Sequence, residues 1–226
     1  MDKFNIAIDG PAGAGKSTIA RLVANTLGFV YVDTGAMYRA VTWNVLRSGI
    51  RPDQEAEVIS VTERMDIRLA PGEEGQMVFV DGSDVTTEIR SAEVTGNVSR
   101  IAQIAEVRRI LTDKQKRLAA DKGVVMDGRD IGSHVLPDAE LKVFLTASVR
   151  IRAERRFKEI QDQRSDVTLE QLEQEIATRD QMDEQRETSP LIQAADAVLL
   201  DTTEMSIPQV VEHILGLCRT KVGGGK

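Results

Sequence analysis

Cysteine and histidine are nearly absent from this sequence of 226 residues. The single cysteine, Cys218, excludes an internal disulfide, and its place in the apolar run from Ile214 to Cys218 predicts a buried helix face and an inert thiol. His134 and His213 are the only histidines, and no clustered Cys, His and Asp spacing accompanies them. We therefore expect no zinc or iron site built by the protein alone, and any metal should arrive with a bound ligand.

Basic residues and long apolar runs are also in short supply. The chain has 29 Lys and Arg against 36 Asp and Glu, a net charge of −7, which argues against a nucleic-acid polymer as its main partner and favours small anions. The apolar stretches are too short to cross a membrane, and a strand begins almost at the N-terminus, with no room for a secretory signal. These absences predict a cytoplasmic protein that binds no membrane.

Glycine, by contrast, is concentrated in one short segment, residues 10–17. This segment follows the apolar alternation of residues 4–8 and precedes a predicted helix of about residues 16–26, which makes it a complete phosphate-binding P-loop. Its glycines let backbone N–H groups point at a triphosphate, while Lys16 supplies a charge for the β and γ oxygens and Ser17 a ligand for Mg²⁺. The residues predicted to bind ATP are Gly10, Pro11, Ala12, Gly13, Ala14, Gly15, Lys16, Ser17 and Thr18.

Strands and helices alternate along most of the chain, which predicts an α/β protein of the three-layer P-loop type with a central parallel five-stranded sheet. The expected strands are residues 4–8, 29–32, 124–126, 141–145 and 197–200. The expected helices are residues 16–26, 36–47, 55–65, 91–120 with a break near 105, 150–163, 168–186 and 207–217. Residues 66–85, with turns at 71–72 and 81–82, predict a small antiparallel β insert.

The length allows one domain of residues 1–220 and no second full domain. We expect its core to comprise residues 1–35, 121–148 and 190–220, with a substrate-binding insert at about 60–100 and a helical lid at about 150–186. Residues 221–226, which end in a glycine run, are expected to form a disordered tail.

Polar motifs follow two of the predicted strands, at 33–35 and at 127–130. Ligands of an open parallel sheet bind beyond the carboxyl ends of its strands. Either motif taken alone would favour a turn or a helix cap, but together with the P-loop the two motifs favour a second substrate site. The arginines leave two interpretations open. They form either a cage for a transferring phosphoryl group or solvated helix faces paired with acidic neighbours such as Glu154, Glu159, Asp180 and Asp183.

Four segments together resemble the bacterial cytidylate kinases, members of the nucleoside monophosphate kinase family, over nearly the full length. They are residues 8–17, 33–39, 127–132 and 179–186 with Pro190-Leu191 after, and the insert at 66–87 is similar to the one that marks the bacterial form. The resemblance implies reversible transfer of the ATP γ-phosphoryl group to CMP or dCMP, with Mg²⁺ bridging the nucleotides.

The resemblance also assigns residues to roles. Arg39, Arg129 and Arg186 are similar to the ligands of the acceptor phosphate, and Arg179 and Asp183 to those of the pentose. Ser99, Arg108 and Asp130 stand where the family recognises cytosine, with Thr34, a serine in some relatives, close by. Arg155 and Arg156 resemble the lid arginines that reach the donor and the transferring phosphate. The implied catalytic residues are Lys16, Arg129, Arg155, Arg156 and Arg186.

Chemistry supports these roles and leaves some alternatives. The Asp130 carboxylate can accept from the amino group of cytosine but would repel the carbonyl of uracil, so CMP should be preferred to UMP. No general base is expected, because the acceptor oxygen is already ionised. The insert and residues 150–163 are expected to close over the substrates.

A P-loop kinase for another small acceptor, such as UMP or shikimate, is the main alternative. A nucleotide-dependent switch is less favoured, because the Asn-Lys-x-Asp guanine signature is absent. By analogy we expect a monomer.

Overall fold

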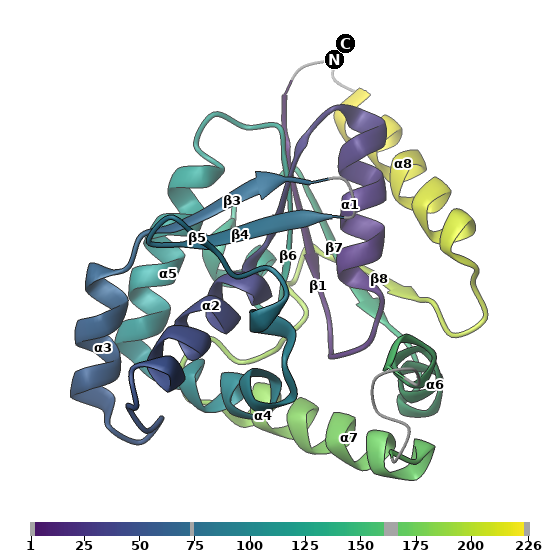
Figure 1. Ribbon diagram of the computed structural model, residues 1–226. Helices are drawn as coiled ribbons and strands as arrows, with labels where there is room; N and C mark the ends of the chain where they lie inside the picture. Colours follow the sequence, from purple (N-terminus) through teal and green to yellow (C-terminus); the bar gives the residue numbers. More distant parts are fainter. Residues whose placement is uncertain (1–2, 73–74, 161–166, 224–226) are drawn as a thin grey trace.

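Five parallel strands form the middle layer of the protein (Figure 1). The computed structural model describes residues 3–72, 75–160 and 167–223. The strands lie in the order β2-β6-β1-β7-β8 and are β1 (Asn5–Asp9), β2 (Val30–Asp33), β6 (Val124–Gly128), β7 (Leu141–Thr146) and β8 (Val198–Asp201). Asp9 pairs in register with Gly128, and Asp33 with Asp127, so three neighbouring strands end at one level. The predicted parallel five-stranded sheet is confirmed.

Side chains of the sheet alternate between two apolar layers, as the period of a β-strand requires. On one face, Ile6 and Ile8 pack with α1 (Lys16–Leu27) and α8 (Ile207–Gly223), and Cys218 is buried there as predicted. On the other face, Ala7 joins a second cluster with a single π-helical turn at Ile131–Val135. The sequence analysis did not predict this turn, which directly follows Asp130 and shapes the loop after β6.

Residues 34–118 form a second packing unit, which we call the helix–insert unit. Its apolar core draws on every helix of the unit and on the insert, with Met37, Val41, Val58, Val78, Ile89, Ile101 and Leu111 among its buried members. The helices are α2 (Thr34–Arg47), α3 (Glu55–Arg64), a 3₁₀ turn (Glu88–Arg90), α4 (Ala92–Ile101) and α5 (Ala105–Leu118). The antiparallel insert predicted from the sequence is confirmed as β3 (Ile67–Pro71), β4 (Gln76–Val80) and β5 (Ser83–Asp84).

Two helices, α6 (Val149–Ile160) and α7 (Leu169–Gln185), pack on each other around Ala153 and Leu172. Thr168 begins α7 with a capping box, because its hydroxyl accepts from Gln171 N while the Gln171 side chain accepts from Thr168 N. The last residues of the helix predicted at 150–163 lie outside the described residues.

The C-terminal helix is longer than the sequence analysis predicted. α8 continues to Gly223 instead of ending at 217, so residues 221–223, which we assigned to a disordered tail, are helical. The reason is local, because no proline or glycine lies between Leu217 and Gly223 to stop the helix. Residues 224–226 lie outside the described part. Among the described helices, none is both long and apolar enough to cross a membrane.

Candidate active site

The P-loop joins the end of β1 to the start of α1 and depends on glycine. Gly10 has a φ of 147°, and a Cβ there would lie 2.0 Å from the carbonyl oxygen of Leu145 on β7. Only glycine therefore lets the loop pass so close to the neighbouring strand. Lys16 is buried at the start of α1, where its Nζ donates to Pro11 O at 2.7 Å. Burial and the nearby Arg129 hold the pKa of Lys16 well below its ordinary value.

Helices α6 and α7 bind the same loop through a buried ion pair. Arg152 Nη1 lies 2.6 Å from Asp180 Oδ2, and both side chains also bind Ala12: Arg152 donates to its carbonyl at 2.9 Å, and Asp180 accepts from its N–H at 3.2 Å. The sequence analysis selected neither Arg152 nor Asp180 as a site residue. Sequence spacing could not pair them with a loop more than a hundred residues away in the chain.

A carboxylate at the end of β6 faces the start of α1. Ser17 Oγ donates to Asp127 Oδ2 at 2.9 Å, and the Tyr31 hydroxyl donates to Oδ1 at 2.9 Å. Burial, followed by the charge of Asp33, raises the pKa of Asp127 to about 7. A hydroxyl and a carboxylate are the hard oxygen donors that Mg²⁺ prefers, so the two side chains fit that ion. Asp127 belongs to the motif at 127–130, but the sequence analysis did not select it as a site residue.

Two further side chains meet in the loop that follows β6. Arg108 Nη2, from α5, lies 2.6 Å from Asp130 Oδ2, and both residues are buried. Arg186 approaches the other oxygen of Asp130, with Nη2 at 3.7 Å from Oδ1. The guanidinium of Arg108 also lies 5.4 Å from the ring centre of Tyr38, a cation–π distance. The structure therefore brings Arg108, Asp130 and Arg186 together from three separate parts of the chain.

Several arginines gather beside this pair and form what we call the arginine cage: Arg39, Arg129, Arg179 and Arg186. Two of them have carboxylate partners at 2.8 Å, Arg39 with Asp33 and Arg129 with Asp183. Burial, followed by the charge of Arg129, lowers the pKa of Arg179 to about 10. Within the described residues, buried guanidinium nitrogens without a hydrogen-bond partner include Arg39 Nε, Arg179 Nε and Arg186 Nη2. Such donors are suited to the oxygens of an anion.

Asp9 links the P-loop strand to the loop that carries Asp130. Its Oδ1 accepts from Ile131 N at 2.8 Å and its Oδ2 from Gly132 N at 2.7 Å. Burial raises the pKa of Asp9 to about 6 in spite of these two hydrogen bonds. The residue directly precedes Gly10, so one carboxylate couples the two loops of the site. The sequence analysis did not select it, because its partners are more than a hundred residues away in the chain.

Comparison with known proteins agrees with this geometry. The chain matches the family model described as cytidylate kinase over residues 6–220. This chain belongs to the cytidylate kinase family. It is 54% identical to the cytidylate kinase of Lysinibacillus sphaericus over 97% of this chain and 98% of that protein. It is 53% identical to the cytidylate kinase of Pediococcus pentosaceus over 95% of each chain. The resemblance found in the sequence is confirmed, and the chain is an enzyme of the nucleoside monophosphate kinase class.

Solved structures are similar in fold alone. A shikimate kinase from Bacteroides thetaiotaomicron has a TM-score of 0.50 and 14% identity, with 96% of this chain and 99% of that chain covered. An uncharacterized protein from Eubacterium ventriosum has a TM-score of 0.54 and 10% identity, with 95% and 98% covered. These likenesses agree with the P-loop kinase fold predicted from the sequence.

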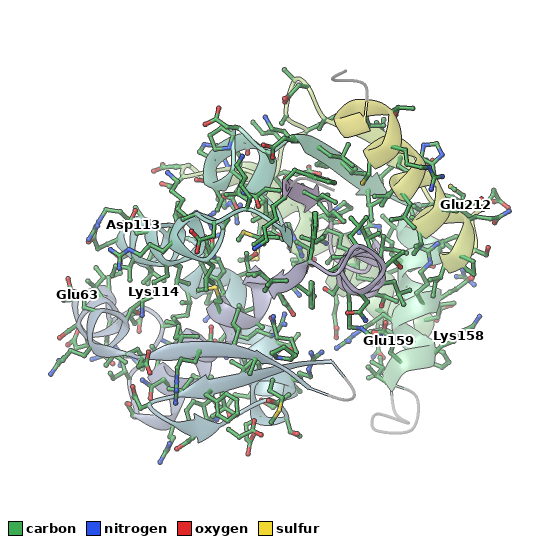
Figure 2. All side chains as sticks on the ribbon, turned by 90° about the horizontal axis from the view of Figure 1, so that it is seen from above. Glu63, Asp113, Lys114, Lys158, Glu159 and Glu212 are labelled. Carbon is green, nitrogen blue, oxygen red and sulfur yellow. The ribbon has the colours of Figure 1, made fainter. Side chains whose placement is uncertain are left out.

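The remaining residues that the family resemblance selected have the following surroundings in this kinase. The Thr34 hydroxyl is buried and donates to Asp127 O at 2.7 Å, and Ser99 lies half-buried on α4. Arg155 donates to Thr202 O at 2.7 Å, and Arg156 pairs with Glu159, labelled in Figure 2, at 3.1 Å. Arg152, Arg155 and Arg156 share a helix but bind three different partners.

Among the described residues, no three His, Cys, Asp or Glu side chains form a metal site.

Proposed function

We propose that this enzyme transfers the γ-phosphoryl group of ATP to CMP or dCMP, giving ADP and CDP or dCDP. The observation that carries the proposal is the buried Arg108–Asp130 pair, which lies next to the arginine cage. A donor and an acceptor side by side suit the edge of a nucleobase, and the adjacent arginines suit its phosphate. The names of the relatives support the same substrate.

The donor nucleotide has a separate binding site at the P-loop. Backbone N–H groups of residues 10–17 and the N-terminus of α1 would receive its phosphates, and Lys16 would move from Pro11 O to the β and γ oxygens. Ser17 and Asp127 would hold the Mg²⁺, which neutralises charge on the β- and γ-phosphates when it is bound. The two nucleotides would then meet at the carboxyl ends of β1 and β6.

Catalysis rests on alignment and charge. The acceptor is a phosphate oxygen that is already ionised, so no side chain has to remove a proton from it. Arg39, Arg129 and Arg186 would hold the acceptor phosphate, and Arg179 would bind the pentose together with Asp183. Because these guanidinium groups are mostly buried, salt and water would screen their attraction for the phosphates only weakly.

Base selection would depend on Asp130. Its Oδ2 is occupied by Arg108, whereas its Oδ1 faces Arg186 at 3.7 Å, which is too long for a hydrogen bond. Oδ1 can therefore accept from the amino group of cytosine. Uracil would place a carbonyl oxygen against the carboxylate, which is repulsive and would also leave both groups without a donor.

The experiment that tests this function offers acceptors one at a time with Mg-ATP and measures ADP production. CMP, dCMP, UMP, AMP, GMP, dTMP and shikimate form the panel, and ATP alone is the control for hydrolysis. We expect turnover confined largely to CMP and dCMP. Activity on another acceptor would overturn the substrate assignment, and ADP production without any acceptor would overturn the transfer reaction.

A further inference from the structure

Gln76, the first residue of β4, binds the outer edge of the central sheet. Its Oε1 accepts from Asp33 N at 2.9 Å, and its Nε2 donates to Tyr31 O at 2.5 Å. Among the strands that the structure describes, β2 is the terminal one and pairs only with β6, so these two backbone groups face away from the sheet. One side-chain amide thus satisfies the N–H and C=O groups that a further strand would have used.

The strand that Gln76 binds is firmly fixed to the catalytic core. Val30 to Asp33 pair residue by residue with β6, and the Tyr31 hydroxyl is held by Asp127. Asp33, at the end of the strand, organises the start of α2: its Oδ1 accepts from Ala36 N at 2.8 Å and caps the helix, and its Oδ2 holds Arg39 at 2.8 Å. Arg39 belongs to the arginine cage. Gln76 therefore binds the backbone of Asp33, whose side chain orients a cage arginine.

The helix–insert unit is joined to the central sheet by polar contacts at separate points. It packs around its own apolar core, and the chain enters it directly from β2 at Thr34 and leaves it through α5 toward β6. The Thr34 hydroxyl, bonded to Asp127 O, lies at the point where the chain enters. Gln76 makes its contact from the middle of the unit and reaches the same strand from the side. A third tie, the buried Arg108–Asp130 pair, joins α5 to the loop after β6. Gln76 is the tie from the insert, and it limits rotation of this side of the unit against β2.

We propose that Gln76 is a positioning residue that fixes the orientation of the helix–insert unit against the sheet. It thereby places Arg39 and the acceptor phosphate in line with the donor. The kinetic consequence of this role rests on the proposed function, but the contact itself can be measured without any substrate. We call the two hydrogen bonds of Gln76 the polar latch. The latch acts on the acceptor half of the site, whereas the P-loop is held by the Arg152–Asp180 pair.

The test compares Gln76→Ala and Gln76→Glu with Gln103→Ala, a control at an exposed glutamine between α4 and α5. Gln76→Glu keeps an acceptor for Asp33 N–H but places an oxygen against Tyr31 O, so it separates the two halves of the latch. The first readout is amide hydrogen exchange of Asp33 in the free protein by NMR. We expect exchange at this amide to become at least about tenfold faster in Gln76→Ala and to stay unchanged in Gln103→Ala.

The second readout is kinetic. We expect KM for CMP to rise about tenfold in both Gln76 variants while KM for ATP stays within about twofold and the thermal midpoint stays close to that of the unmodified protein. Unchanged exchange at Asp33 in Gln76→Ala, or an equal rise of both KM values, would overturn the latch. If the unmodified enzyme does not use CMP at all, the proposed function fails, whereas the exchange result still decides whether the latch exists.

Discussion

Arg152 and Asp180 form a buried ion pair, 2.6 Å between Nη1 and Oδ2, that binds both the N–H and the C=O of Ala12. The pair therefore joins α6 and α7 to the loop expected to hold the ATP phosphates. Each ion has lost its hydration, and the contact is favourable only while both partners are present. A change in either helix is thus transmitted directly to the backbone of the P-loop.

Replacing Asp180 by Asn keeps the shape of the side chain but leaves Arg152 as an uncompensated buried cation. We expect Asp180→Asn to lower the free energy of unfolding by about 3 kcal/mol and to raise KM for ATP at least about tenfold. Urea denaturation and steady-state kinetics measure the two effects. Glu154→Gln is the matched control, because it breaks the exposed Arg150–Glu154 pair on α6, the helix that carries Arg152. This variant should lower the free energy of unfolding by less than about 0.5 kcal/mol. An equal loss in both variants would contradict the role of the Arg152–Asp180 pair at the P-loop.

Gly10 and Gly28 differ in the space around them, although both have a positive φ. A Cβ at Gly10 would lie 2.0 Å from Leu145 O, whereas none of the described atoms lies within 4 Å of a Cβ at Gly28. We expect Gly28→Ala to cost about 1 kcal/mol of stability from backbone conformation alone. Gly10→Ala should cost about 3 kcal/mol or more, because a main-chain carbonyl must also move. Thermal denaturation of the two variants compares them, and similar midpoints would contradict the close packing of the loop against β7.

Asp9 should make stability depend on pH between about 4 and 6.5. Burial raises its pKa from 3.8 to about 6. The folded protein therefore retains a proton that the unfolded chain has already released, and stability falls as pH rises through this window. The shift corresponds to a loss of about 3 kcal/mol. Asp9→Asn removes this contribution, so the difference in unfolding free energy between the two proteins should change by that amount. A difference that stays constant with pH would contradict the raised pKa.

Cys218 should resist thiol reagents in the native protein. Burial on the inner face of α8 raises the pKa of its thiol from 9.0 to about 11. The thiolate is the reactive form, so at pH 8 its population falls about a hundredfold below that of an ordinary cysteine. We expect no reaction with a disulfide reagent within minutes at pH 8 and complete reaction of one thiol after denaturation in guanidinium. Fast labelling of the native protein would show that the face between α8 and the sheet opens.

Asp130→Asn should relax base selection. An amide can turn its N–H toward the carbonyl of uracil, so the repulsion that rejects UMP is lost. We expect the ratio of kcat/KM for CMP to that for UMP to fall at least about tenfold. Asp183→Asn is the control, since Asp183 binds Arg129 of the cage at 2.8 Å and is expected to bind the pentose. It should lower activity with both acceptors and leave their ratio unchanged, and equal ratios for the two variants would contradict the role of Asp130.

Much of the fold could be predicted because the relevant signals are local. Alternation at residues 4–8 and the glycines at 10–15 identify β1 and the P-loop, and the Asp81-Gly82 turn identifies the hairpin of the insert. The prediction of where α2 begins was less accurate. Asp33 accepts from Ala36 N and lets the helix begin at Thr34, earlier than the predicted residue 36. A capping side chain decides such a boundary, and its hydrogen bond is not visible in an apolar pattern.

The candidate site could be predicted only in part, because its contacts join distant segments. Strand-end motifs selected Arg129 and Asp130, and the family resemblance added Arg108, but only the fold pairs Arg108 with Asp130. Arg152 is one of four arginines on α6. Its choice of Ala12 and Asp180, while Arg155 binds Thr202, follows from the way α6 packs against the loop. The roles of the cage arginines toward substrates stay predictions.

Gln76 has a further consequence for the protein in solution. The free edge of a sheet can recruit a strand from another molecule, which is a common start of aggregation. At β2 the outward-facing N–H of Asp33 and C=O of Tyr31 are already bonded within the same chain. The contact that positions the insert therefore also removes a template for intermolecular strand pairing, and a chain that loses it should become more prone to self-association before it loses its fold.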